Sequence, residues 1–104
     1  VRDVQAGLCD LAIGNTYYMI AMQSNPDQKA WAGAVKILFP NAADRGTHVN
    51  ITGASLLANA PNRDNGQKLI EYLVSSEAQK IYAEAIGEYP AVPGVEASAS
   101  VEAW

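Results

Sequence analysis

Short apolar runs separated by glycines and polar turns characterise the first half of the chain. Residues 8–13 (LCDLAI) are flanked by glycines, and residues 35–39 (VKILF) are followed by a proline. Runs of this length and composition are typical of buried strands. Residues 47–53 (THVNITG) follow a polar turn and are rich in β-branched side chains, which favour extended structure. The pattern therefore predicts short strands over these runs.

Helical signals surround the apolar runs. Residues 1–6 have the pattern of a helix end, with Gly7 available as a left-handed cap. After the first run, Asn15 or Thr16 can cap a helix over residues 16–23 (TYYMIAMQ). The pattern thus places one helix before the first predicted strand and one directly after it.

A further helix is expected next, with Asn25 as its N-cap and Pro26 in its first helical position. Proline disfavours helical geometry in the residue before it, so the preceding helix must end by Asn25. The new helix should weaken at Gly33. Apolar residues then recur at helical spacing over residues 62–74 and again over residues 75–86, which predicts two surface helices.

The last part of the chain and the overall pattern complete the prediction of the fold class. Residues 88–95 (EYPAVPGV) hold two prolines and are expected to run extended over a surface. Helices that alternate with short buried strands favour an α/β fold over an all-α or all-β fold. The predicted fold class is therefore α/β.

Composition narrows the range of partners. The chain has 104 residues, is 49% hydrophobic and carries a net charge of -4, with no run of Lys or Arg. This excludes the basic surface on which nucleic-acid and anionic-membrane binding depends. No apolar stretch approaches the roughly 18–20 residues of a membrane span, and the first residues lack the pattern of a signal peptide.

The ends of the chain and its cysteine carry further information. The chain opens on Val1 rather than Met and stops at Trp104 directly after VEA, so we expect it to be a fragment. The single Cys9 has no partner for an internal disulfide. Its place in an apolar run predicts a small buried side chain.

Tyr17 and Tyr18 are the strongest candidates for ligand-binding residues. They follow a predicted strand and open a predicted helix, with Asn15 and Thr16 in front of them. Ligands of open α/β sheets bind at the carboxyl ends of strands, and a helix start adds backbone N–H donors that favour anions. Phenolate is a hard oxygen donor, and a highly charged cation can displace its proton. Iron(III) is the natural candidate.

Spacing alone does not decide between a metal site and a structural role for these tyrosines. Paired tyrosines are commonly structural, with one ring in the core and the other hydrogen-bonded at the surface. Adjacent side chains diverge by about 100° inside a regular helix. Tyr17 and Tyr18 can therefore reach one ligand only from the cap or the first turn of the helix.

Other polar residues give no support for catalysis. His48 is the only histidine, has no metal-ligating residues at suitable spacing, and is interpreted as structural. Arg45 is interpreted as an exposed turn residue. A nucleophile with its base, a calcium loop and a glycine-rich phosphate loop are all missing from the sequence. We therefore expect the protein not to be an enzyme.

Four segments, taken together and in order, carry a resemblance to a known family: GLCDLAIGNTYYMIAM, LFPNAADRGTHVNITGA, KLIEYLVSSEAQKIYAE and EYPAVPGV. The chain resembles the C-terminal part of the periplasmic ferric-ion-binding proteins of bacterial ABC importers. The likeness covers nearly the whole chain. It implies a two-lobed type II periplasmic-binding-protein fold, a periplasmic location, and the capture of iron(III) for delivery to an ABC importer.

The resemblance also implies roles for particular residues. Tyr17 and Tyr18 match the paired phenolate ligands of iron(III). Asn15 matches a position that in some members contacts the synergistic anion, such as carbonate or phosphate, which completes the coordination of the iron. The other ligands would lie upstream of Val1. His48 does not match the histidine ligand of the family.

The same resemblance implies a division of the chain between two lobes. Residues 1–47 would form part of the second lobe, which carries the iron-binding tyrosines. Residues 48–97 would form the crossover and part of the first lobe, and residues 98–104 would return to the second lobe. The expected partners are ferric ion, an ABC permease of the inner membrane and the missing N-terminal part of the same protein, with no nucleic acid.

Two other interpretations stay open at this point. The chain can belong to a type II binding protein for an organic or oxyanion solute, in which Tyr17 and Tyr18 stack or form hydrogen bonds instead of ligating a metal. It can also be an inert fragment without activity of its own. An enzyme or a regulator built on the same fold is a third possibility in principle, but no group of residues supports it.

Overall fold

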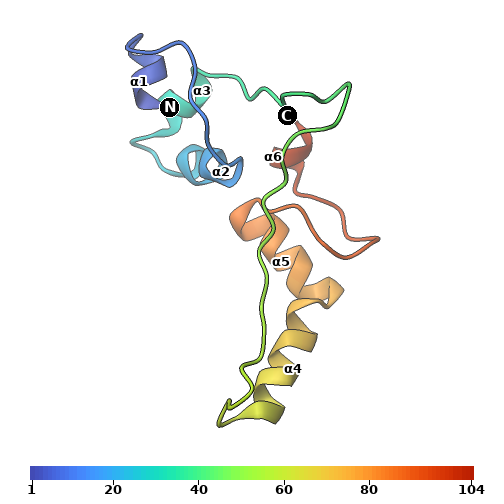
Figure 1. Ribbon diagram of the computed structural model, residues 1–104. Helices are drawn as coiled ribbons and strands as arrows, with labels where there is room; N and C mark the ends of the chain where they lie inside the picture. The colour runs from blue at the N-terminus through green and yellow to red at the C-terminus, as the bar shows by residue number, and fades with distance from the viewer. The chain divides into compact units, whose positions relative to one another are not determined.

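Helices are the only regular secondary structure in the computed structural model, which describes all residues from Val1 to Trp104 (Figure 1). The chain divides into two compact units, Val1–Asn50 with Ala103–Trp104 as unit 1 and Ile51–Glu102 as unit 2. None of the helices has the length and apolar character that crossing a bilayer requires. The helices are α1 (Arg2–Gln5), α2 (Tyr17–Ser24), α3 (Lys29–Gly33), α4 (Arg63–Leu73), α5 (Ser76–Ile86) and α6 (Ala99–Glu102).

Unit 1 contains α1, α2 and α3, and two of its predicted helix ends are confirmed. Gly7 follows α1 in the left-handed region, with φ of 72°. Thr16 occupies the N-cap position of α2, although its side chain makes no capping hydrogen bond, and the helix ends before Asn25. α3 contacts both α2 and α1. Met19 on α2 and Ala32 on α3 are the buried residues of these helices.

The next helix begins later than the sequence pattern predicts. The side-chain oxygen of Asn25 accepts a hydrogen bond of 2.9 Å from the backbone N–H of Asp27. The carbonyl of Asn25 accepts two more, from the N–H groups of Gln28 at 3.0 Å and Lys29 at 2.9 Å. Side-chain bonding of this kind by asparagine stabilises turns in place of helix. The turn occupies the predicted first positions, and α3 starts at Lys29.

The predicted strands do not form. Residues 8–13, 35–39 and 47–53 have no regular secondary structure, and the first of these runs bends at Leu8 and Asp10. Their apolar side chains are uncovered: Ile13 is fully exposed and Leu38 is 73% exposed. A strand needs hydrogen bonds to a neighbouring strand, and no such neighbour lies beside these runs within the chain. The prediction of α/β structure is therefore wrong for this chain by itself as far as its strands are concerned.

The position of Cys9 also differs from the prediction. The thiol was expected to be buried, and it is exposed. The reason is the same, because burial of the run from residue 8 to residue 13 depends on a sheet that this chain does not form.

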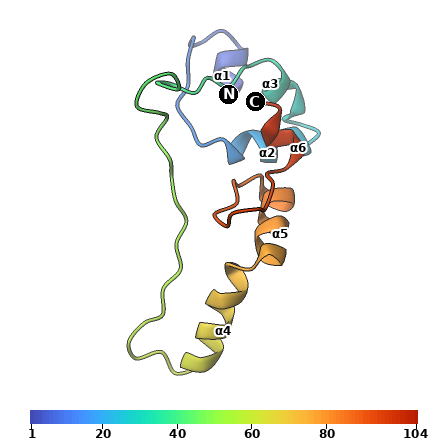
Figure 2. The same cartoon turned by 90° about the vertical axis from the view of Figure 1, so that its right-hand side faces the viewer.

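Unit 2 contains the two long helices that the periodicity predicts. α5 begins where Ser75 accepts a hydrogen bond of 3.2 Å from the backbone N–H of Ala78, and it ends at Gly87, which has φ of 74° in the left-handed region. Ala78 and Ala83 are the buried residues of α5. The segment before α4 is mostly exposed, with Ile51 at 81%, but the Leu56 side chain lies against Gly66 of α4. Figure 2 shows the backbone of this segment beside the two helices.

The end of unit 2 holds one element that the sequence pattern did not reveal. Residues 88–95 contain no helix, as predicted, but α6 follows over Ala99–Glu102. Val101 on α6 is almost completely buried, at 1% exposure. A helix of four residues is too short to produce a recognisable apolar period.

One side chain ties the tail of unit 2 to its helices. The Gln79 amide nitrogen donates a hydrogen bond of 2.8 Å to the carbonyl of Leu73, at the end of α4. The Gln79 amide oxygen accepts a hydrogen bond of 2.7 Å from the backbone N–H of Ala91, in the extended tail. Gln79 therefore joins the last residue of α4 to a segment that would otherwise have few backbone partners.

We expect Gln79→Leu to destabilise the tail locally, because both hydrogen bonds disappear and each contributes about 0.5–1.5 kcal/mol. The measurement is hydrogen exchange of the Ala91 amide in the full-length protein that carries this chain, which should accelerate by an amount equivalent to about 1–3 kcal/mol. Gln67→Leu is the matched control, since Gln67 bonds only the exposed Glu71 of its own helix. Equal exchange rates in the two variants would contradict this role of Gln79.

Candidate metal centre

The adjacent tyrosines lie at the start of α2, where the sequence places them. Tyr17 and Tyr18 are the first two residues of the helix. Tyr17 is half-buried and Tyr18 is 53% exposed. The ring centroids are 4.5 Å apart and the ring planes are inclined by 53°. Side chains that would diverge inside a regular helix are therefore neighbours here.

Asn15 is bonded to both tyrosines. Its side-chain amide nitrogen donates a hydrogen bond of 3.1 Å to the phenol oxygen of Tyr17. Its backbone carbonyl accepts a hydrogen bond of 3.3 Å from the N–H of Tyr18. The sequence marked Asn15 as a capping residue and, by resemblance, as a contact of an anion, but the bond to Tyr17 was not predicted. The signal in the sequence that could have predicted this bond is the spacing, because Asn15 stands two residues before Tyr17.

The backbone at this helix start offers fewer donors than expected. The N–H of Tyr18 is bonded to Asn15, and the N–H of Met19 donates to the carbonyl of Thr16 at 2.9 Å. The expectation of free N–H groups for an anion is therefore wrong for these two positions. The short turn that begins α2 uses them internally. The chemistry of the site rests on the phenol oxygens and the Asn15 side chain.

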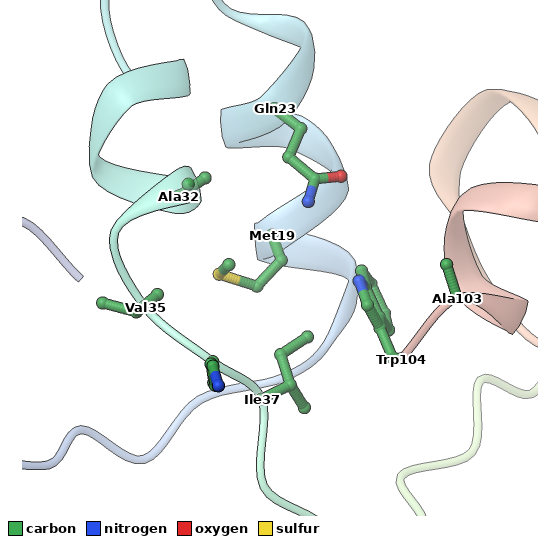
Figure 3. Close-up of a pocket in the computed structure, with 9 residues that line it drawn as sticks. Met19, Gln23, Ala32, Val35, Ile37, Ala103 and Trp104 are labelled. Carbon is green, nitrogen blue, oxygen red and sulfur yellow. The ribbon is translucent and has the colours of Figure 1, made fainter.

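A pocket in unit 1 lies next to α2 but is a different feature. It has a volume of about 390 Å³, and neither tyrosine lines it. Figure 3 shows Met19, Ile37 and Trp104 among the side chains around it. Lys36 is the only charged residue of its lining, so the pocket has no group of converging acidic ligands. The complete lining is Met19, Gln23, Ala32, Gly33, Val35, Lys36, Ile37, Ala103 and Trp104.

The other candidate residues form no site of their own. His48 and Arg45 are both exposed. No three side chains of His, Cys, Asp or Glu come together in a way that could hold a metal ion. Within this chain, Tyr17 and Tyr18 are therefore the hard-donor residues whose side chains lie together, with ring centroids 4.5 Å apart.

Comparison with known proteins identifies the family. The model of the bacterial extracellular solute-binding proteins matches residues 4–104, which is nearly the entire chain. The chain belongs to this family. The extracellular solute-binding proteins bind solutes and are not enzymes, which confirms the prediction that the protein has no catalytic activity.

Members of the family that handle iron are similar to this chain. Iron uptake protein A2 of Synechocystis sp. is 46% identical over 99 residues, which span 91% of this chain and 29% of that protein. The solved apo ferric ion-binding protein A of Pasteurella haemolytica superposes with a TM-score of 0.92 at 44% identity, over 99% of this chain and 32% of that one. These relatives confirm the resemblance to ferric-ion-binding proteins.

A third relative carries bound ligands. The Trichodesmium protein, solved in complex with iron and citrate ligands, superposes with a TM-score of 0.88 at 44% identity, over 97% of this chain and 33% of that one. The match to these structures supports the predicted fold in its coarser form, as part of a type II periplasmic binding protein. The chain spans about a third of the length of the relatives it matches.

Proposed function

We propose that this chain is part of a longer ferric-ion-binding protein and supplies two ligands of the iron, Tyr17 and Tyr18. The observation that carries the proposal is the placement of two phenol rings at 4.5 Å at the start of α2. The chain in which they lie is 44% identical to a ferric ion-binding protein over nearly its entire length. The geometry supports the site, and the similarity supports the choice of ion.

The chemistry of the donors accounts for the choice of ion. Phenolate oxygens are hard ligands, and displacement of their protons needs a cation of high charge. Iron(III) meets this condition better than divalent ions, which compete less effectively with the proton. Selectivity would therefore follow from the ligand type. The iron would be the cargo of the protein, and its release would break the bonds to the phenolate oxygens without chemical conversion of a substrate.

We propose capture and release as the mechanism. Residues 1–47 would belong to the lobe that carries the tyrosines, residues 48–97 to the crossover and the other lobe, and residues 98–104 to a return segment. Closure of the lobes would bring further ligands, from sequence before residue 1, onto the iron. In the periplasm, the closed form would then deliver the ion to an ABC permease.

A synergistic anion would complete the coordination shell in this proposal. Carbonate and phosphate are the anions that the resemblance implies. Citrate joins them, because the Trichodesmium relative was solved with iron and citrate. Asn15 lies at the edge of the tyrosine pair, where its side chain could contact such an anion or a ligand oxygen.

An iron(III) titration of the full-length protein that carries this chain, followed by visible absorbance, tests the proposed function. Binding through phenolate produces a charge-transfer band, which should saturate at one iron per protein and should not appear with zinc(II). If the protein shows no band with iron(III), and binds instead an organic solute or an oxyanion with a change in tyrosine fluorescence, the solute interpretation replaces this one.

A further inference from the structure

The hydrogen bond between Asn15 and Tyr17 has a direction that matters for ligation. The side-chain amide of Asn15 is the donor and the phenol oxygen of Tyr17 is the acceptor, at 3.1 Å. The bond does not use the phenol proton. It can therefore persist when a metal ion takes the place of that proton, because a phenolate oxygen can accept more than one bond.

The hydrogen bond from Asn15 affects the orientation of both tyrosine rings. Asn15 is partly buried, and its carbonyl also holds the backbone N–H of Tyr18 at 3.3 Å. The ring of Tyr18 lies against that of Tyr17, with centroids 4.5 Å apart. An amide that fixes the oxygen of Tyr17 therefore restricts the orientation of both rings.

We propose that Asn15 is a positioning residue for iron capture, which acts through its hydrogen bond to the Tyr17 oxygen. This inference rests on the proposed function. Partners that hydrogen-bond to metal ligands orient those ligands, and their loss typically weakens metal binding about 10- to 100-fold. The role differs from contact with a synergistic anion, because it requires Tyr17 and does not require the anion.

A double-mutant cycle in the full-length protein separates the two roles. Iron(III) affinity is measured by competition with nitrilotriacetate for the wild type, Asn15→Leu, Tyr17→Phe and the double variant. Asn15→Leu should weaken binding about 10- to 100-fold on its own. In the Tyr17→Phe background it should change the affinity by no more than about twofold, because its partner oxygen is already gone. An equal loss in both backgrounds overturns the proposal.

A second readout keeps the test decisive if the Tyr17→Phe protein binds too weakly to measure. At saturating iron and phosphate, the charge-transfer band of Asn15→Leu should shift and lose absorbance per bound iron, because the Tyr17 oxygen is no longer held. The loss of affinity should also be the same at low and high phosphate. A band identical to that of the wild type, or an affinity restored by phosphate, assigns Asn15 to the anion and overturns the positioning role.

Two further variants separate positioning from general effects on the fold. Asn62→Leu makes the same change at the N-cap of α4, where the side chain makes no capping hydrogen bond, and should leave iron binding unchanged. Asn15→Ser keeps a residue that suits a helix start but is too short to reach Tyr17, and should reproduce the loss seen with Asn15→Leu. If the wild type has no charge-transfer band, the proposed function fails. If it has one and Asn15→Leu matches it, only this inference fails.

Discussion

Tyr18→Phe in the full-length protein is expected to weaken iron(III) binding by more than the roughly 100-fold that loss of a partner around a metal site can cause, because a ligand itself is removed. Tyr17→Phe should have a similar effect. Phenylalanine keeps the ring and its packing at 4.5 Å but has no oxygen for the metal. The charge-transfer band should weaken and shift in each variant, since each leaves one phenolate. Visible absorbance during an iron titration measures both effects.

Tyr89→Phe is the matched control for this experiment. Tyr89 is 56% exposed, close to the 53% of Tyr18, and lies in the tail of unit 2. The Tyr89→Phe variant loses the same hydroxyl group from a similarly exposed position, and it should bind iron(III) like the wild type. The assignment of Tyr17 and Tyr18 as ligands is wrong if both of their variants keep the band unchanged.

The chain of residues 1–104, purified by itself, is expected to bind the dye ANS strongly and to unfold without a sharp thermal transition. Its buried apolar core consists of Met19, Ala32, Ala78, Ala83 and Val101. These residues are mostly small and remove little apolar surface from water, so they contribute little of the hydrophobic free energy that folding requires.

The accessible surface of the chain leads to the same expectation. It amounts to 8257 Å². Two compact bodies of half the mass of this 11.1 kDa chain would together expose about 6,800 Å². Large apolar residues make up part of the excess, among them Leu8 and Leu11, each 77% exposed. Exposed apolar area of this kind promotes dye binding and association.

Circular dichroism during heating measures how sharply the chain unfolds, and ANS fluorescence in parallel measures its exposed apolar surface. The full-length protein is the control, and it should melt cooperatively and bind little dye. A sharp transition of monomeric 1–104 without dye binding would show that the extended segments find cover within the chain, contrary to their exposure in the structure.

The sequence predicted features that depend on nearby residues more accurately than features that depend on residues far apart in the chain. α5 was predicted almost to the residue, because Ser75 and Gly87 determine its ends through contacts within a few residues. The start of α3 was misplaced because Asn25 had two local options, a helix cap and a turn, and bonds Asp27 in the turn. The apolar runs were predicted as strands and form none, because pairing depends on partner strands that no local pattern reveals.

The candidate site shows the same division. The adjacency of Tyr17 and Tyr18 and their place at a helix start could be read from the sequence, and the resemblance to ferric-ion-binding proteins could be recognised from NTYY and the segments around it. The spacing could not show whether the rings diverge or lie together. It also could not show that the Asn15 amide donates to the Tyr17 oxygen, since that depends on side-chain rotamers at the first turn.

The sequence by itself determined the family, the helices of residues 63–86 and the identity of the phenol pair, because these depend on composition, on contacts within about four residues and on motif order. Only the tertiary structure decided that the rings of Tyr17 and Tyr18 lie 4.5 Å apart, that Cys9 is exposed and that the apolar runs form no sheet. The physical reason is that strand pairing and the burial of a side chain are set by residues distant in sequence, whose positions follow from the whole fold.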